Sequence, residues 1–367
     1  MERSQLAAPA RPESADAVKP AAPQPDRRHV FVLGAGFSRA ISGAMPLLPD
    51  LSTRVLERYR DAASIPPYVR ELLRSNFEEA LSFLISPKPW LRESEILRHR
   101  ALYLELTQVV AVVLGDAISD ALHGMAREAP VWLVKLLLNW HRDHSVVVTQ
   151  NYDTLVEGVA GEITIPEGSE NHLMAVQSLY PPFLTDAGNR SGTIIFGGPG
   201  PKTFELLKLH GSSNWYFSGL SSARGEPIYY IPPPGPIATW NGVNPEESQS
   251  RLAAVADKYP LIIPPVIDKA SLLTHETIQS LWFRAGEALY QAREVTFIGY
   301  SLPMSDLVMR HFLASRLNLA ATINVVDVNE RMGDHYCGVL RIDPARVRTF
   351  SGPECVNAYV ERLVREA

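Results

Sequence analysis

Six short apolar runs, each followed by glycine, proline or polar residues, limit the folds open to this chain. They cover residues 30–33, 145–149, 206–209, 259–263, 294–298 and 323–326. Such short runs, rich in Val, Ile and Leu, are typical of strands buried on both faces of a parallel sheet. Helical patterns lie between several of them. We therefore predict an α/β fold, with a Rossmann-like parallel sheet, helices on both of its faces and ligand binding at the carboxyl ends of the strands.

The helical patterns define the rest of the organisation. Helical periodicity extends through residues 50–60, 67–140, 272–292 and 306–317. The 67–140 segment falls between the first two strands, so we predict a helical insertion of three to five helices there. Residues 160–203 and 218–258 are rich in Gly, Pro and Asn, which predicts long loops with short strands.

The first 28 residues differ from the remainder of the chain. They combine many Pro and Ala residues with scattered charges, and they lack the apolar segment of a signal peptide. Such a composition cannot form a packed core. We therefore predict a disordered tail at 1–28 and one folded domain at 29–367.

Charge and cysteine content exclude several classes of protein. The net charge is -5, which provides no overall attraction to nucleic acid or to an anionic membrane. The two cysteines, Cys337 and Cys355, are too few for a disulfide framework or a four-cysteine zinc site. No uninterrupted apolar run reaches the roughly 18–20 residues of a membrane span. We expect a cytoplasmic protein that holds no metal.

The first strand is followed by the sequence GAGFS at residues 34–38. Gly34 and Gly36 permit a tight turn and a close backbone approach, so the N–H groups of the next helix can hold a phosphate or pyrophosphate. The fingerprint of hydride-transfer enzymes needs a third glycine, and Arg39 occupies that position. It also needs a second strand ending in Asp or Glu about 20 residues later, where this chain is helical in pattern. A dehydrogenase is therefore disfavoured.

Four further strand ends carry polar groups. They are QNYD at 150–153, HG at 210–211, GYS at 299–301 and DVN at 327–329. Each has an ordinary structural explanation when taken alone: Asn151 and Asp153 can cap the following helix, and His210 can occupy a turn. Because all of them follow predicted parallel strands, they are expected at the same edge of the sheet.

Several neighbouring residues have a structural explanation that competes with a functional one. Ser305 is expected to cap the 306–317 helix, and Asp306 is either a first-turn carboxylate or a ligand group. Packing roles are expected for His144, Trp215 and Trp240.

In this order the motifs resemble those of the sirtuin family. GAGFSRAISGAMP is similar to the first sirtuin motif, TQNYD to its T-Q-N-I-D, LHGS to its catalytic H-G, GYS to its G-T-S and INVVDVN to its late I-N stretch. The resemblance extends over roughly residues 29–345, interrupted by the helical insertion. Sirtuin deacylases also carry two C-x-x-C pairs for a structural zinc after the H-G motif, and no cysteine lies between His210 and Cys337. NYDTLVE, KLHGSSNW and GYSLPMSD resemble more closely the bacterial sirtuin-like effectors of antiphage defence.

This resemblance implies an NAD glycohydrolase that cleaves NAD to nicotinamide and ADP-ribose and depletes NAD on phage infection. NAD is then the substrate. The implied catalytic residues are Asn151, Asp153 and His210: the amide and carboxylate complement a primary carboxamide, and imidazole, which titrates near neutral pH, suits a general base. The implied NAD-binding residues are Gly34, Ala35, Gly36, Phe37, Ser38, Gln150, Gly299, Tyr300, Ser301, Asp327 and Asn329.

Two other functions stay open from the sequence. One is an NAD-dependent protein deacylase or ADP-ribosyltransferase, which the missing zinc cysteines disfavour. The other is a non-catalytic module that binds NAD or ADP-ribose and signals by conformation. A toxic NADase needs control, so we expect a homo-oligomer, a regulatory partner of the ATPase or Argonaute type by analogy, or both. The helical insertion suits either an internal core or contact with such a partner.

Overall fold

The computed structural model describes residues 29–60, 65–86, 88–125, 129–167, 170–174, 176–191, 202–219, 222–233, 245–263, 274–304 and 306–366. The predicted tail at 1–28, Ser305 and Trp240 lie outside these ranges. The strands are β1 (His29–Leu33), β2 (Val146–Thr149), β3 (Thr164–Glu167), β4 (Glu170–Leu173), β5 (Thr185–Asp186), β6 (Glu205–Lys208), β7 (Gly211–Phe217), β8 (Tyr229–Tyr230), β9 (Tyr259–Ile262), β10 (Glu294–Ile298), β11 (Thr322–Val326) and β12 (Val347–Phe350).

The helices alternate with these strands and also form a separate group after β1. They are α1 (Ala35–Ile41), α2 (Leu48–Arg58), α3 (Pro67–Ser75), α4 (Phe77–Ile85), α5 (Glu93–Met125), α6 (Val131–Arg142), α7 (Leu155–Ala160), α8 (Val176–Leu179), α9 (Ala187–Ser191), α10 (Pro245–Ala254), α12 (Glu276–Gln291), α13 (Leu307–Arg316), α14 (Met332–Leu340) and α15 (Cys355–Glu366), with a short 3-10 turn at Pro344–Arg346.

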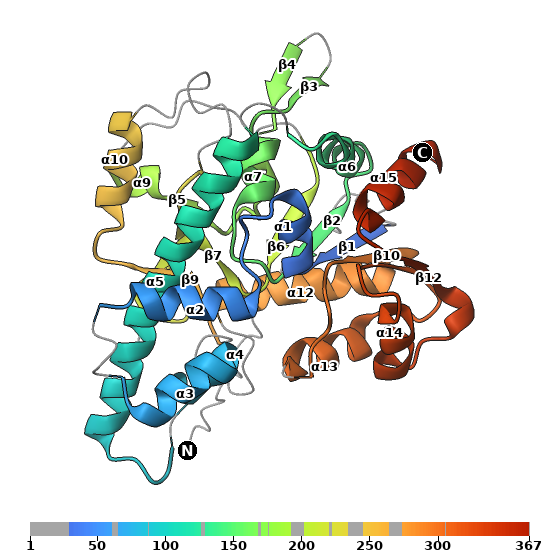
Figure 1. Cartoon of the computed structure of the whole chain (residues 1–367). Coiled ribbons are helices and arrows are strands. Elements are labelled where there is room, and N and C mark those ends of the chain that lie inside the picture. Colours follow the sequence, from blue (N-terminus) through green and yellow to red (C-terminus); the bar gives the residue numbers. More distant parts are fainter. Residues whose placement is uncertain are drawn as a thin grey trace, which may run out of the picture.

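A six-stranded parallel sheet organises the molecule (Figure 1), which confirms the predicted fold class. Its strand order is β12-β11-β10-β1-β2-β6, and every neighbouring pair is parallel. When these six strands are numbered 1 to 6 by their order in the chain and listed across the sheet from β6 to β12, the order is 3-2-1-4-5-6. This is the strand order of dinucleotide-binding folds. In such sheets the direction of winding reverses between the first and fourth strands, which here are β1 and β10.

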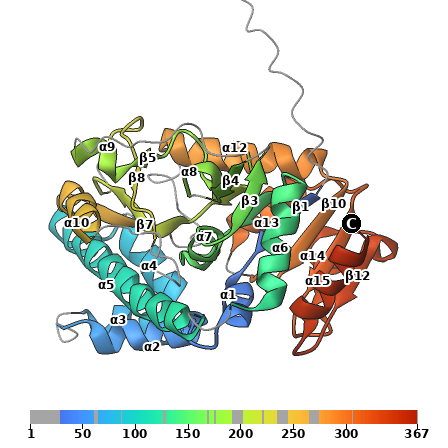
Figure 2. The same cartoon turned by 90° about the horizontal axis from the view of Figure 1, so that it is seen from above.

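Helices cover both faces of this sheet, as predicted. On one face Trp140 of α6 packs between Phe31 of β1 and Phe204, with ring centroids 5.2 and 5.3 Å away. On the other face Phe297 of β10 meets Tyr336 of α14 at 4.5 Å. Because Phe31 pairs with the residue before Phe297, the two phenylalanines point to opposite faces. Seen from above, α6 and α12 lie on opposite sides of β1 (Figure 2).

A second sheet, which the sequence analysis missed, follows His210 directly. Its order is β5-β8-β7-β9, with β7 antiparallel to both of its neighbours. The run at 259–263 is therefore a strand, as predicted, but β9 belongs to this antiparallel sheet and not to the parallel one. The 218–258 segment also contains helix α10, where only loops were expected.

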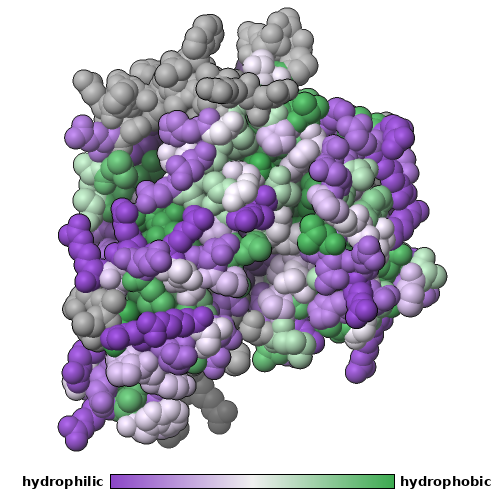
Figure 3. Space-filling view, viewed as in Figure 1, coloured by the Kyte–Doolittle hydropathy of each residue, from purple (hydrophilic) through white to green (hydrophobic). Residues whose placement is uncertain are grey.

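Helices α2 to α5 form a lobe beside the second sheet. Four helices, α3 to α6, fall within the predicted insertion at 67–140, although α6 packs on the parallel sheet as described above. Tyr103 of α5 donates a hydrogen bond to the Ile262 carbonyl at 2.8 Å, which ties the lobe to β9. The part that carries α3 and the start of α5 projects below the remainder of the molecule (Figures 1 and 3).

Helix α5 is the longest element. Within the described ranges it is the one helix that is long and apolar enough to cross a membrane by length and composition alone. Of its most apolar window, 44% is buried inside the protein. Its buried face contacts α2, α4 and β9, and core helices of soluble proteins meet the same criterion.

Candidate functional site

All six strands of the parallel sheet end on one row of paired residues. The row is Lys208, Thr149, Leu33, Ile298, Val326 and Phe350, from β6 to β12. Backbone bonds continue just past it, since the Gly34 N–H donates to the Ile298 carbonyl at 3.1 Å and the Gly299 N–H to the Val326 carbonyl at 2.9 Å. The GAGFS, QNYD, HG, GYS and DVN motifs therefore emerge together at one edge of the sheet, as the sequence predicts.

The loops after β1 and β10 touch each other where the winding of the sheet reverses. The Gly36 N–H donates to the Gly299 carbonyl at 2.9 Å. Gly299 has φ of +58°, and a Cβ there would lie 2.2 Å from the Phe37 nitrogen. A Cβ on Gly34 would lie 2.6 Å from the Gly299 carbonyl oxygen. Both positions therefore require glycine, which is the physical reason for the G-x-G and G-Y-S motifs.

The GAGFS backbone differs in one respect from the expected phosphate cradle. The N–H groups of Gly34, Gly36 and Phe37 donate to carbonyls within the protein, namely those of Ile298, Gly299 and Gly34. Three amides of the motif are thus already bonded. Ala35 is the exposed residue of the motif, whereas Phe37 and Ser38 are buried.

Asn151, Ser38 and Asp153 form a hydrogen-bonded cluster between the β1 and β2 loops. The Asn151 Nδ2 donates to the Gly34 carbonyl at 2.8 Å and to the Ser38 hydroxyl at 2.9 Å. The Ser38 hydroxyl donates in turn to Asp153 Oδ2 at 2.6 Å. Asp153 Oδ1 accepts the Leu155 N–H at 3.2 Å, so this carboxylate also bonds the first residue of α7, whose N-cap residue is Thr154. The structure therefore brings together the two residues predicted to act at the reacting end of the substrate, and it makes Ser38 the link between them.

Gln150 lies at the same end of β2 and has an unusual environment. Its side chain is 9% exposed, and neither its amide oxygen nor its amide nitrogen has a hydrogen-bond partner. A buried amide without partners costs free energy, so such a group commonly serves a ligand or an ordered water. A residue predicted to bind NAD thus has a side-chain amide that bonds to none of the described residues.

His210 lies in the turn between β6 and β7 and is 2% exposed. Its carbonyl accepts the Ile263 N–H at 2.8 Å, and its ring centroid lies 6.2 Å from that of Trp282 on α12. Since Lys208 pairs with Thr149, His210 and Asn151 each stand two residues beyond the common row on adjacent strands. Two of the three predicted catalytic residues therefore follow adjacent strands at the sheet edge.

Tyr300 and Asp306 hold the loop after β10. The Tyr300 hydroxyl donates to Asp306 Oδ2 at 3.0 Å, while Asp306 Oδ1 accepts the Met309 N–H at 3.1 Å. Burial, followed by the nearby Asp306 carboxylate, raises the pKa of Tyr300 well above its ordinary value. Asp306 is thus the cap of α13, so the predicted cap at Ser305 was placed one residue too early. Both Asp306 oxygens serve the fold, which favours the helix-carboxylate interpretation over the ligand group.

The remaining predicted contacts lie farther along the same edge. Asp327 Oδ1 accepts the Asn329 N–H at 2.9 Å, and Asn329 Oδ1 accepts the Arg331 N–H at 3.0 Å. Both side chains therefore stabilise the turn after β11. Ser301 and Asn329 are exposed and Asp327 is half-buried. Four strand spacings separate β6 from β11, about 19 Å, so His210 and Asp327 lie at the two ends of the predicted site.

Two groups near the cluster were not identified from the sequence. Lys208 and Glu157 form an ion pair at 2.8 Å, and each side chain is 1% exposed. Tyr152 is half-buried at this edge; desolvation of its hydroxyl, and then the Glu78 carboxylate of α4, raise its pKa well above the ordinary value. The one sequence signal for the Lys208–Glu157 pair is a lysine at the end of an apolar run.

Other expectations concern packing and metals. Trp215 is fully buried edge-on against Tyr180, with ring centroids 5.3 Å apart, and the ring of His144 lies 6.3 Å from that of His141. Packing thus accounts for Trp215, whereas His144 is half-buried and its packing role stays a prediction. Across the described ranges, no three or more His, Cys, Asp or Glu side chains are grouped so that they could hold a metal ion.

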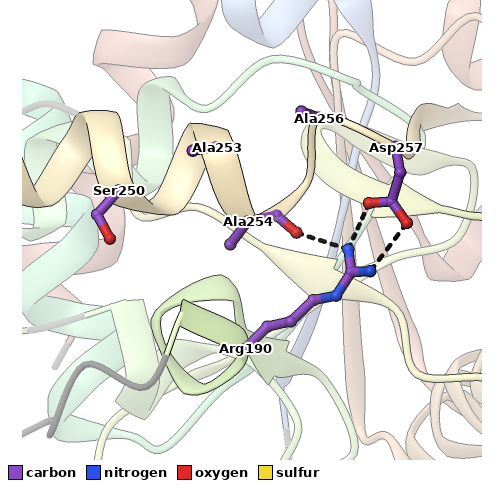
Figure 4. A pocket seen from close by; sticks show the side chains of 6 residues that line it. All are labelled: Arg190, Ser250, Ala253, Ala254, Ala256 and Asp257. Atoms are coloured by element: carbon purple, nitrogen blue, oxygen red, sulfur yellow. Dashed lines mark hydrogen bonds and ion pairs between the residues drawn. The ribbon is translucent and has the colours of Figure 1, made fainter.

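A surface hollow lies away from the sheet edge, between α9 and α10 (Figure 4). It is lined by Arg190, Ser250, Ala253, Ala254, Ala256 and Asp257. The Arg190 guanidinium spans both Asp257 carboxylate oxygens, at 2.5 and 2.8 Å. Its charge is therefore matched within the protein, and the small side chains around it offer no reactive group.

Comparisons with known proteins find likeness in structure alone. No protein-family model and no curated protein matches the chain. Similar solved structures include a mutant Sir2 homologue with ADP-ribose (12% identity, TM-score 0.39, 93% of this chain and 91% of that one). Others are Sir2 with a p53 peptide and NAD+ (15%, TM-score 0.36, 93% of both chains) and a structure on the basis of sirtuin substrate affinity (13%, TM-score 0.37, 93% and 94%).

Proposed function

We propose that this chain is an NAD glycohydrolase, which cleaves NAD to nicotinamide and ADP-ribose. The observation that carries the proposal is the side-chain cluster of Asn151, Ser38 and Asp153, next to the unpartnered amide of Gln150, at the carboxyl edge of a dinucleotide-type sheet. The order of motifs along the chain resembles the sirtuin order, and each motif emerges at this edge. A dinucleotide would lie across the winding reversal, with its adenosine part towards Asp327 and its nicotinamide part towards His210.

The proposed reaction consumes one water molecule. The bond between the nicotinamide nitrogen and the ribose breaks, nicotinamide leaves as a neutral molecule, and positive charge develops on the ribose. Water attacks this carbon and loses a proton, so that NAD+ and water give nicotinamide, ADP-ribose and a proton. Because the leaving group is already cationic, the protein needs no strong acid to expel it, unlike an enzyme that cleaves an ordinary glycoside.

The roles proposed for the residues follow from this chemistry. The Asp153 carboxylate supplies negative charge near the ribose cation. Asn151 and Gln150 supply amide groups, which can both donate to and accept from a primary carboxamide or ribose hydroxyls. His210 would accept the proton from water. Gly34 to Ser38 would line the pyrophosphate, with Gly299 to Ser301 beside it and Asp327 and Asn329 at the adenosine end.

The motif resemblance also suggests a biological use. We propose that the enzyme acts in the cytoplasm as an abortive-infection effector, which depletes NAD when a phage infects the cell. Its activity would be controlled by self-association or by a partner protein of the ATPase or Argonaute type, by analogy. The lobe formed by α2 to α5 offers such contacts a surface apart from the sheet edge.

The test is an NAD-consumption assay with mass measurement of the products. The purified chain is assayed alone and with the proteins encoded by neighbouring genes. We expect nicotinamide and ADP-ribose in equal amounts, and a loss of about 100-fold or more in Asn151→Ala and in His210→Ala.

Matched controls are available on the same chain. Asn318 binds the Ala292 carbonyl near the opposite edge of the sheet, and His123 is exposed on α5. Asn318→Ala and His123→Ala should keep full activity. Wild-type turnover in both site variants would contradict the proposal, as would O-acyl-ADP-ribose formed from an acylated peptide, or tight NAD binding with no turnover under any condition.

A further inference from the structure

A buried charged pair lies directly beneath the Asn151–Ser38–Asp153 cluster. Lys208 is the last residue of β6 and Glu157 lies on α7. The Lys208 ammonium donates to Glu157 Oε1 at 2.8 Å and also donates to the main-chain carbonyl of Asp153. Both side chains are 1% exposed. The pair therefore contacts the backbone of a predicted catalytic residue, whose side chain belongs to the cluster.

Further buried hydrogen bonds fix the other side of this pair. The Tyr180 hydroxyl donates to Glu157 Oε1 at 2.7 Å, and burial followed by the Glu157 charge raises the pKa of Tyr180 well above its ordinary value. Tyr180 also lies 3.4 Å from the Asn214 amide oxygen, which accepts the Ser212 hydroxyl at 2.6 Å. Glu157 is thus bonded both to Lys208 and to Tyr180, and Tyr180 in turn contacts Asn214 of β7.

Removing a lysine and a glutamate from water is costly unless their charges and hydrogen bonds are well matched. Such pairs are often no more stabilising than apolar side chains of the same size, so stability alone does not account for this one. What an apolar pair cannot supply is the N–H donor that Lys208 directs at the Asp153 carbonyl. This donor fixes the turn in which Asp153 points towards Ser38.

We propose that Lys208 and Glu157 are positioning residues that hold Asp153, and through Ser38 also Asn151, in the geometry needed for turnover. Glu157 orients Lys208, and Lys208 anchors the Asp153 backbone. The Asp153 carboxylate then receives the Ser38 hydroxyl at 2.6 Å, and Ser38 receives the Asn151 amide at 2.9 Å. This proposal rests on the proposed NAD hydrolysis for its kinetic effect, but its structural effect is independent of any ligand.

The test replaces the pair without leaving a lone buried charge. In Lys208→Met/Glu157→Met both charges disappear and the volume is nearly kept. We expect a folded protein whose kcat for NAD falls about 10- to 100-fold while its KM changes less than about threefold, since misplacement of reacting groups acts on turnover. The Leu155 amide, which donates to Asp153 Oδ1, should exchange its hydrogen faster than in the wild type.

A second buried ion pair provides the matched control. Asp186 of β5 and Arg251 of α10 are joined at 3.0 Å, and their side chains are 3% and 7% exposed. Asp186→Leu/Arg251→Met should leave kcat and the Leu155 exchange rate unchanged. Equal kinetic loss in the two double variants, or unchanged Leu155 exchange in Lys208→Met/Glu157→Met, would overturn the assignment. If the wild type does not consume NAD, the proposed function fails, and the exchange measurement still decides whether the pair holds Asp153.

Discussion

Replacing Gly299 by alanine tests whether contact between the β1 and β10 loops, and not backbone conformation alone, requires glycine there. Two costs add in Gly299→Ala. A left-handed φ costs a residue with a side chain about 1–2 kcal/mol. The new methyl group would also lie 2.2 Å from the Phe37 nitrogen and 2.4 Å from the Gly36 carbonyl carbon, where forced repacking costs about 1–3 kcal/mol. We therefore expect a loss of about 2–5 kcal/mol in the free energy of unfolding.

Gly352 separates these two costs. Its φ is +95°, yet no atom lies within 4 Å of the position a Cβ would take. Gly352→Ala should therefore lose only the conformational part, about 1–2 kcal/mol. The lower chain entropy of alanine in the unfolded state is common to both variants and cancels in the comparison. Urea denaturation at constant slope measures both values. Equal losses of unfolding free energy in Gly299→Ala and Gly352→Ala would show that close contact between the loops after β1 and β10 does not require glycine at Gly299.

Three further predictions concern buried polar groups. Burial, only partly opposed by the charge of Glu294, lowers the pKa of His29 from 6.5 to about 4, so the unfolded chain takes up the proton first as the pH falls. The free energy of unfolding should therefore be independent of His29 above pH 6.5 and fall by about 3 kcal/mol between pH 6.5 and pH 4. Denaturation series across this pH range measure that fall, and His29→Gln should remove it. Lys208→Met alone leaves the Glu157 carboxylate buried without its partner, so the free energy of unfolding should fall by about 3–5 kcal/mol. Lys208→Met/Glu157→Met should recover most of that loss. Equal stabilities of the single and double variants would show that the pair is not electrostatically coupled. Asp306→Ala removes the cap of α13 and the acceptor of the Tyr300 hydroxyl, so we expect a loss of about 1–3 kcal/mol by thermal denaturation. Asp306→Asn keeps one acceptor oxygen for the cap and should lose less than Asp306→Ala.

Five of the six strands of the parallel sheet could be predicted from the sequence because they are buried on both faces, whereas β12, with Arg348 and Thr349 exposed, was missed. Such strands appear as uninterrupted apolar runs, and predicted and observed ends of β1, β2, β6, β10 and β11 differ by one residue at most. The residues that follow those ends could then be placed at one edge by topology alone. The motifs could be located in this way, but the hydrogen bonds between their side chains could not be predicted.

The second sheet was missed for a physical reason. β7 has the sequence GSSNWYF, in which Ser212 and Asn214 interrupt the apolar pattern. Both are buried because they bond to each other and to the Tyr152 and Ile231 carbonyls, which come from distant parts of the chain. Local pattern rules count such residues as exposed and so predict a loop.

Long-range contacts also decided the details of the candidate site. Serine and aspartate are equally good caps, and the contact with Tyr300 selects Asp306 over Ser305. Lys208 reads as an exposed residue at a strand end, yet its partner Glu157 comes from α7. Neither the cap at Asp306 nor the burial of Lys208 can therefore be predicted from the neighbouring residues in the sequence.

The common row on which the six strands end limits the insertions and deletions that the chain can accept. One residue added within β2 would carry the QNYD loop forward by about 3.3 Å and turn the following side chains to the opposite face of the sheet. Asn151 would then point away from Ser38 even though both residues were still present. Strand length is therefore under as strict a constraint as residue identity, and divergence should take the form of whole-loop replacement beyond the row, with the length of each strand unchanged.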